Sequence, residues 1–348
     1  MSSPTDLPAE DGNSSLHQAL TASLAYAASY PVRRMLLSNH LPMVMTALHR
    51  LKAPVATMWT QFERIAPRLA PLAPDSPEAD TARRHAQALA EDGRSAVLAR
   101  YLPALLLASE SSSFHGLIRV AYAIDAGHPG ELAHALAGWT YRLEFLGPPL
   151  SDAVPVGLPT IAAALGEAMN VEAFDFSAPP ESTITDDMQA CAAMPGFDEF
   201  VIGARAPSDA ALTLDAFAEA SLAAYLASRD FVALHLVTAC HALRLVLPHA
   251  RLSPEQTRTV MRGFWRAWLA AWVSCGRPAP DWVAVRLGPA AVEAHWADAL
   301  PTLTAQGDDH QIKLAWTALA EWRFRGWPGY ARVLPASPAV AANPRPQP

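Results

Sequence analysis

The stretch "AQGDDHQIKLAWTALAEW", residues 305–322, begins with charged and polar residues and continues as an almost wholly apolar run. Asp308 stands near the start of this stretch, and Gln311 lies three residues after Asp308. In a capping box, residues at this spacing hydrogen-bond each other's backbone at the start of a helix. The stretch therefore predicts a capped helix over residues 309–325.

The rest of the chain favours the same kind of element. The 348 residues are 51% hydrophobic, which is enough to bury a large core, while glycine is scarce and strand-like alternating runs are few. We therefore predict an all-α fold, a multi-helix single globular domain with a buried metal site. The expected helices span residues 15–28, 39–51, 55–72, 77–107, 112–124, 129–143, 213–228, 231–246, 254–272, 290–300 and 309–325. Pro103 is expected to kink or end the fourth of them early.

Composition also predicts how the domain is delimited. Residues 1–12 and 335–348 are polar and Pro-rich or low in complexity, so both termini are expected to be disordered around a helical domain at 13–334. A Pro-rich connection at about 146–183 could separate two domains or cross the surface of one. We favour the second interpretation.

Charge limits the classes of partner and location. The net charge is -7 and the pI is near 5.9, without a Lys/Arg run, so nucleic acid is not expected as a partner. The N-terminus is acidic rather than basic, and no apolar stretch reaches the roughly 18 to 20 residues of a membrane span. Cys191, Cys240 and Cys275 lack CxxC spacing and are expected to be free thiols. The sequence predicts a cytoplasmic protein that does not act on membranes.

Five of the twelve histidines lie in apolar helical sequence: His40, His115, His235, His241 and His310. One such histidine is more often a hydrogen-bonded core residue than a ligand, but convergence on one metal would satisfy several together. Lys313 lies three residues after His310, on the same helix face. His235 and His241 are six residues apart, so the sequence leaves open which of them faces a shared site. HExxH, GxSxG, GxGxxG and P-loop motifs are absent.

Four motifs together resemble one known family. "SNHLPMVMTALHRL", "FHGLIRVAYAID", "LHLVTACHALR" and "DDHQIKLAWTALAEW" occur in that order over roughly residues 35 to 330, and they are similar to the questin oxidase-like family. The resemblance implies a non-heme iron oxygenase that acts on aromatic polyketides of the anthraquinone type. It would use Fe²⁺, O₂ and a reduced nicotinamide such as NADPH for oxygen insertion or oxidative C–C cleavage.

The resemblance also implies a ligand set of four histidines and a carboxylated lysine. The lysine would be Lys313 with His310 beside it, and the other ligands would come from His40, His115 and the pair His235 and His241. Lys313 is one of only two lysines in the chain. A buried lysine near a metal can lose its proton and react with carbon dioxide to form a carbamate, whereas arginine stays protonated.

One position departs from the family pattern. The second motif usually has a histidine four residues after the first, and this chain has Arg119 there. If that histidine is a ligand in the family, the site here is altered; if it is not, Arg119 is a candidate catalytic residue that binds an acidic or phenolate group. Phe114 and Trp316 are candidates to hold a flat aromatic substrate, although a single aromatic is more often part of the core.

Two other classes of function remain open from the residues. A metal-dependent hydrolase would use zinc-bound water at the same histidines. A non-catalytic helical binding protein could have arisen from the oxidase family through the change at Arg119. Oligomeric state is not predicted by the sequence.

Overall fold

The computed structural model describes residues 12–148, 150, 160–203 and 210–334, and in this part the protein is all-α apart from one short hairpin. The hairpin pairs β1 (Ser29–Val32) with β2 (Met35–Ser38) in antiparallel register. The helices are α1 (Gly12–Ser23), α2 (Leu41–Arg50), α3 (Val55–Ile65), α4 (Pro77–Asp92), α5 (Arg94–Leu105), α6 (His115–Ala126), α7 (Pro129–Tyr141), α8 (Ile161–Ala168), α9 (Ile184–Ala192), α10 (Phe197–Gly203), α11 (Ala210–Ser228), α12 (Phe231–Val246), α13 (Pro254–Ser274), α14 (Trp282–Arg286), α15 (Val292–Gln306) and α16 (Asp309–Arg325). The termini predicted to be disordered lie outside the described residues, apart from Gly12.

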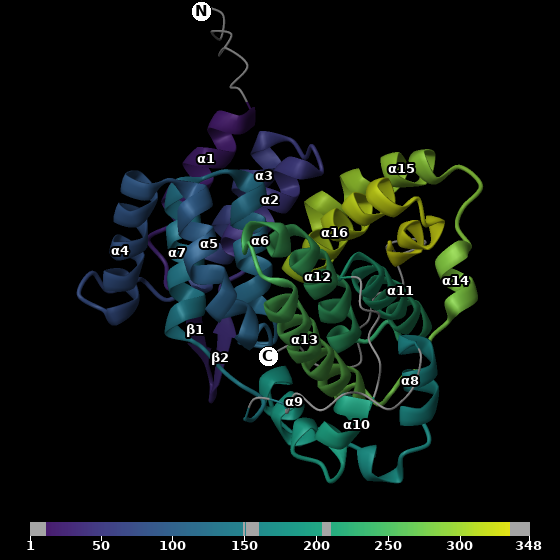
Figure 1. Cartoon of the computed structure of the whole chain (residues 1–348). Helices are drawn as coiled ribbons and strands as arrows, with labels where there is room; N and C mark the ends of the chain where they lie inside the picture. Colours follow the sequence, from purple (N-terminus) through teal and green to yellow (C-terminus); the bar gives the residue numbers. More distant parts are fainter. Residues whose placement is uncertain (1–11, 149, 151–159, 204–209, 335–348) are drawn as a thin grey trace, which may run out of the picture.

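The N-terminal and C-terminal helices form two groups that pack against each other. Figure 1 shows α1 to α7 on one side, α11 to α16 on the other, and α8 to α10 across one end. Helix α6 contacts α12, and α2 contacts α16, so the two groups share one hydrophobic core. The predicted all-α, single-domain fold is therefore confirmed.

Four helices from both groups form a closed ring of contacts. Helix α2 packs on α6, α6 on α12, α12 on α16, and α16 on α2. Each ring helix carries a polar residue of interest near its N-terminal end: His40 is the N-cap of α2, His115 begins α6, His235 is in the second turn of α12, and His310 is in the first turn of α16. The helix packing brings these four histidines together.

Several helix boundaries agree closely with the sequence. Helix α16 spans 309–325 as predicted, and Asp308 and Gln311 form the expected capping box. Helix α12 spans the predicted 231–246. Ser253 caps α13, with Pro254 at its first position. These ends are specified by local side-chain to backbone hydrogen bonds, which is why sequence predicts them well.

Three predicted helices were wrong in extent. The helix predicted over 15–28 ends at Ser23, and the one predicted over 55–72 ends at Ile65. Residues 77–107 do not form a single helix, because Gly93 adopts a positive φ of 79° and separates α4 from α5. This conformation suits glycine, which has no Cβ to clash. Pro103 lies inside the last turn of α5, which ends two residues later at Leu105. The predicted helix is therefore interrupted at Gly93, and Pro103 is followed by only two more residues of α5.

The prediction that no apolar stretch reaches the length of a membrane span was wrong, because α12 and the turn after it, Phe231–His249, are long and apolar enough by length and composition. In the protein, however, 72% of the apolar window is buried against other helices. A helix that is apolar all round is also what the centre of a helical domain requires. The burial of α12 thus accounts for its composition.

Candidate metal centre

Four imidazole rings and one lysine side chain meet where the ring helices converge. His40 Nε2 lies 2.8 Å from His115 Nε2. The ring centroid of His310 is 4.6 Å from that of His40, and the His235 ring is 5.1 Å from His115 and 5.5 Å from His310. Lys313 is 2% exposed and follows His310 by one turn of α16. The structure thus brings together five of the six residues predicted as metal ligands.

Hydrogen bonds fix the orientation of three of these rings. Each uses Nδ1 toward an oxygen: His40 toward Asp309 Oδ2 at 2.6 Å, His115 toward the Ser112 carbonyl at 2.6 Å, and His235 toward the Phe231 carbonyl at 2.8 Å. A carbonyl or carboxylate oxygen only accepts, so each Nδ1 must donate its proton. In the neutral ring Nε2 then carries the lone pair, which is the form that binds metals.

The contact between His40 and His115 is therefore not an ordinary hydrogen bond. Both Nε2 atoms are acceptors in the neutral rings, so no proton lies between them. Burial and the neighbouring Lys313 charge lower the pKa of His40, while burial and the His40 charge hold the pKa of His115 well below its usual range. Protonation of either ring is thus disfavoured, which leaves two lone pairs facing each other.

The spacing of the donor atoms fits a metal ion. Two nitrogens on adjacent corners of a coordination shell, each about 2.1 Å from the ion, lie roughly 3 Å apart. The candidate ligand atoms of His40, His115 and His310 all lie within 4.8 Å of one another. His310 Nδ1 is also buried without a hydrogen-bond partner. This donor set is compatible with a transition metal that accepts imidazole and carboxylate ligands.

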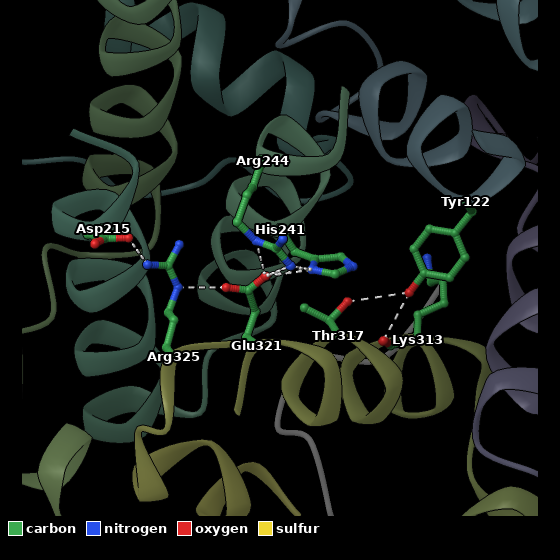
Figure 2. A network of polar contacts seen from close by, with 8 residues as sticks. All are labelled: Tyr122, Asp215, His241, Arg244, Lys313, Thr317, Glu321 and Arg325. Atoms are coloured by element: carbon green, nitrogen blue, oxygen red, sulfur yellow. Dashed lines mark hydrogen bonds and ion pairs between the residues drawn. The ribbon is translucent and has the colours of Figure 1, made fainter. Parts of the chain in front are cut away.

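Lys313 is buried beside the four histidines, and its pKa is lowered. Burial lowers its pKa to about 8, although Asp309 and Asp308 oppose the shift. The same burial, with the Lys313 charge, lowers the pKa of His235 to about 3 and that of His310 well below its usual value. Tyr122 Oη donates to the Lys313 carbonyl at 3.1 Å and so anchors this turn of α16 (Figure 2). A considerable fraction of Lys313 is therefore a neutral amine near pH 8.

Asp309 is the carboxylate residue of the histidine cluster. Burial would raise its pKa, but the hydrogen bond from His40 and the charges around it hold the pKa well below its usual value. It is thus an ionised carboxylate that orients a candidate ligand imidazole. The side chains of Asp309 and His310 are 15% and 13% exposed, so the centre approaches the surface at the start of α16.

A left-handed turn presents His115. Ser112, Ser113 and Phe114 have φ values of 52°, 58° and 69° immediately before α6 begins. Left-handed backbone costs a residue other than glycine roughly 1–2 kcal/mol. Glu144 Oε2 accepts a hydrogen bond from the Ser112 amide at 2.6 Å, and Ser113 Oγ lies 2.9 Å from Thr185 Oγ1. The turn is thus held from two sides.

His241 belongs to a different cluster. Its Nδ1 lies 2.7 Å from Glu321 Oε1, which also accepts from Arg244 Nε at 2.8 Å, while Arg325 Nε donates to Glu321 Oε2 at 2.7 Å (Figure 2). Of the two histidines left open on α12, His235 therefore lies in the cluster with His115 and His310, and His241 does not. Its Nε2 is buried and makes no hydrogen bond to another described residue.

Arg119 and the two candidate substrate aromatics, Phe114 and Trp316, make their contacts with other parts of the core. Arg119 is 5% exposed and forms a two-pronged ion pair with Glu131, at 2.7 Å from Nε and 3.0 Å from Nη2. Its charge is thus largely compensated within the protein. Phe114 is fully buried against Phe264, and Trp316 is partly buried against the core. These two aromatics pack as core residues in the described structure.

A small cavity lies behind His115, with a volume of about 30 Å³. Its lining includes His115, Arg119, Trp139 and Arg142. A single water needs roughly 10–15 Å³ by this kind of measure, so the cavity suits a molecule of a few atoms and not a polycyclic ring.

Three carboxylates important to these clusters were not predicted: Glu131, Glu144 and Glu321. The only sequence signal was weak, because Glu321 follows Lys313 by two turns and therefore lies on the same face of α16. Glu144 lies in an irregular segment 32 residues after Ser112, and Glu131 pairs with Arg119 across two helices. Such pairings come from tertiary packing.

Comparisons with known proteins give one family assignment. A search of curated proteins gives no match. The family model described as questin oxidase-like matches residues 37–318, which is most of the chain and includes α2, α6, α12 and the first part of α16, with His310 and Lys313. The chain belongs to the questin oxidase-like family.

Proposed function

We propose that this protein is a non-heme iron oxygenase that acts on an aromatic, polyketide-like substrate. Family membership supports the oxidoreductase class. The observation that carries the proposal is the pair of facing Nε2 atoms in His40 and His115, 2.8 Å apart, each with its Nδ1 already engaged. Two such lone pairs in a buried site are best satisfied by a cation.

In this proposal His40, His115, His235 and His310 hold Fe²⁺, and Lys313 supplies an oxygen ligand as a carbamate. The pKa of about 8 supports the amine chemistry. The neutral Nζ attacks the carbon of CO₂, a C–N bond forms, one C=O electron pair moves to oxygen, and the nitrogen releases a proton to water. The product carries a negative charge in place of the ammonium, and the metal can stabilise that charge.

Bound iron would supply the site for activating O₂, with NADPH as the source of reducing equivalents. The protein's own residues orient the ligands and exclude water. Asp309 fixes His40 by its 2.6 Å contact, and Phe231 packs edge-on against both His235 and His310. In this proposal a flat aromatic substrate enters at the start of α16, where the Asp309 side chain is 15% exposed.

Metal analysis of protein purified without oxygen tests the proposal. We expect about one iron per chain in the wild type and a ¹³C carbamate signal after exchange with ¹³C-bicarbonate. Lys313→Arg should lose both the signal and O₂ consumption, because a guanidinium cannot form this carbamate. Lys52→Arg is the matched control, since it changes the other lysine. Zinc without iron would instead support a hydrolase, and full retention of iron and activity in Lys313→Arg would contradict the carbamate.

A further inference from the structure

The left-handed turn before α6 is held at one residue from two directions. The Ser112 amide donates to Glu144 Oε2 at 2.6 Å, and the Ser112 carbonyl accepts from His115 Nδ1 at 2.6 Å. These two groups belong to the two peptide planes that meet at the Ser112 Cα. A carboxylate that fixes the first plane therefore limits the rotation of the second, and with it the direction of the His115 ring.

Glu144 is itself braced. Its Oε1 accepts from Arg142 Nη2 at 3.1 Å, and its backbone amide donates to Ser111 Oγ at 3.0 Å. The Ser111 hydroxyl donates to the Ala108 carbonyl at 2.8 Å, and its oxygen also lies 3.3 Å from the Glu144 carbonyl. The segment after α7 is thus paired to the turn through backbone and side chain, so Glu144 is held in place relative to Ser112.

The turn needs such support because it is not favourable by itself. Three consecutive residues with positive φ, none of them glycine, would relax toward the right-handed or extended regions without an external hold. Relaxation would move the Ser112 carbonyl away from Nδ1 of His115. The ring would then lose the acceptor that keeps its proton on Nδ1 and its Nε2 lone pair directed at His40.

We propose that Glu144 is a positioning residue of the metal centre, acting through the Ser112 peptide on the tautomer and direction of His115. This inference rests on the proposed metal site but assigns a role to a residue that touches none of the ligands directly. A charge-assisted hydrogen bond to a backbone amide is among the stronger ones available to a protein, which suits the role.

The test uses Glu144→Ala and Glu144→Gln in the full chain, with Glu91→Ala as control. Glu91 is an exposed glutamate on α4 that accepts a hydrogen bond from Gln87, away from the ring helices. Cobalt(II) serves as the probe, because its visible spectrum reports ligand geometry. We expect Glu144→Ala to weaken cobalt binding about 10- to 100-fold and to change the spectrum, as for other residues that orient metal ligands. Glu91→Ala should match the wild type.

A second readout does not need metal. In the metal-free wild type, long-range ¹⁵N–¹H spectra should show the His115 proton on Nδ1, with the signal assigned by its absence in His115→Gln. In Glu144→Ala we expect a mixture of tautomers. Glu144→Gln keeps a neutral acceptor for the Ser112 amide, so its cobalt affinity should lie between the other two, and it decides the matter if Glu144→Ala does not fold.

Different results separate this inference from the proposed function. If the wild type binds no cobalt and its His115 proton lies on Nε2, both the metal site and the positioning role fail. If the wild type binds cobalt but a folded Glu144→Ala, or Glu144→Gln where Ala does not fold, shows the same affinity, spectrum and tautomer, only the role of Glu144 is overturned.

Discussion

His40 and His115 face each other through Nε2 atoms 2.8 Å apart, while the Nδ1 atoms of both rings donate elsewhere. Their ring planes are nearly parallel, at 13°. Two buried acceptors at this distance repel each other unless a proton or a metal lies near both, and the lowered pKa values of both rings disfavour the proton. In the proposed function, a bound cation would relieve this repulsion.

The first prediction concerns which histidines bind metal. His115→Ala should lose most of the bound metal, because it removes one of the two facing donors. His241→Ala should keep it, because His241 contacts Glu321 in the second cluster. Metal content by elemental analysis after gel filtration, with both variants purified in the same way, checks this. Equal metal loss in the two variants would contradict the assignment of His235 rather than His241 to the centre.

The second prediction concerns the buried pair of Arg119 and Glu131. Arg119→Met should destabilise the protein by about 3–5 kcal/mol, because it leaves the Glu131 carboxylate buried without its partner. The double variant Arg119→Met, Glu131→Leu should recover much of that loss, since no buried charge then remains. Urea unfolding of the two single variants and the double variant gives the coupling free energy. A coupling near zero would mean that the pair does not form.

The same pair shows where sequence reasoning reached its limit. Arg119 stood out because it replaces a histidine of the family motif, and it was therefore predicted to bind substrate. The structure gives it a buried partner on the next helix, at a sequence separation of 12 residues. The partner, Glu131, could not be identified without knowing that α6 packs on α7. The sequence alone therefore did not reveal that the Arg119 charge is compensated by an ion pair.

Local signals were more informative. The capping box at Asp308 predicted the start of α16, and the ranges predicted for α12 and α13 agree closely with the structure, because the causes of helix ends lie within a few residues. The hairpin at 29–38 and the helices α8, α9 and α10 were not predicted. Their sequences are short or interrupted by proline, and their stability depends on neighbours such as α13, on which α9 and α10 pack.

At the centre itself, sequence predicted the residue types better than their grouping. His310 and Lys313 could be paired from their spacing on one helix. The convergence of His40, His115 and His235 depends on the contacts among α2, α6 and α12, which are long-range. The choice between His235 and His241 was open for the same reason, since both lie on a buried helix and only the positions of α6 and α16 distinguish them.

The third prediction concerns the network of His241, Glu321, Arg244 and Arg325. Glu321→Ala should destabilise the protein by about 3–5 kcal/mol, because it leaves a buried arginine and a buried histidine without their acceptor. Asp215→Ala, at the half-exposed end of the same network, should cost no more than about 1 kcal/mol. Denaturant unfolding measures both. Similar losses for the two variants would show that burial does not determine the contribution of these contacts.

The last prediction uses Glu110, which lies in the turn that leads to His115. Burial raises the pKa of Glu110 to about 7, against an ordinary value of 4.5. Below pH 4.5 the group is protonated in both the folded and the unfolded chain. Between pH 4.5 and 7 the unfolded chain releases the proton first, so rising pH favours unfolding, and the loss is complete above about pH 7.

The size of this effect follows from the shift. Each pKa unit corresponds to about 1.4 kcal/mol, so the group lowers the free energy of unfolding by about 3 kcal/mol across this window. Glu110→Gln keeps an oxygen that can accept from the Leu146 amide, 3.2 Å away in the wild type, but it cannot ionise. The variant should therefore lose less stability than the wild type between pH 5 and pH 7.5 in urea unfolding. Parallel pH profiles for the two proteins would mean that Glu110 ionises normally and that its burial is relieved when it carries charge.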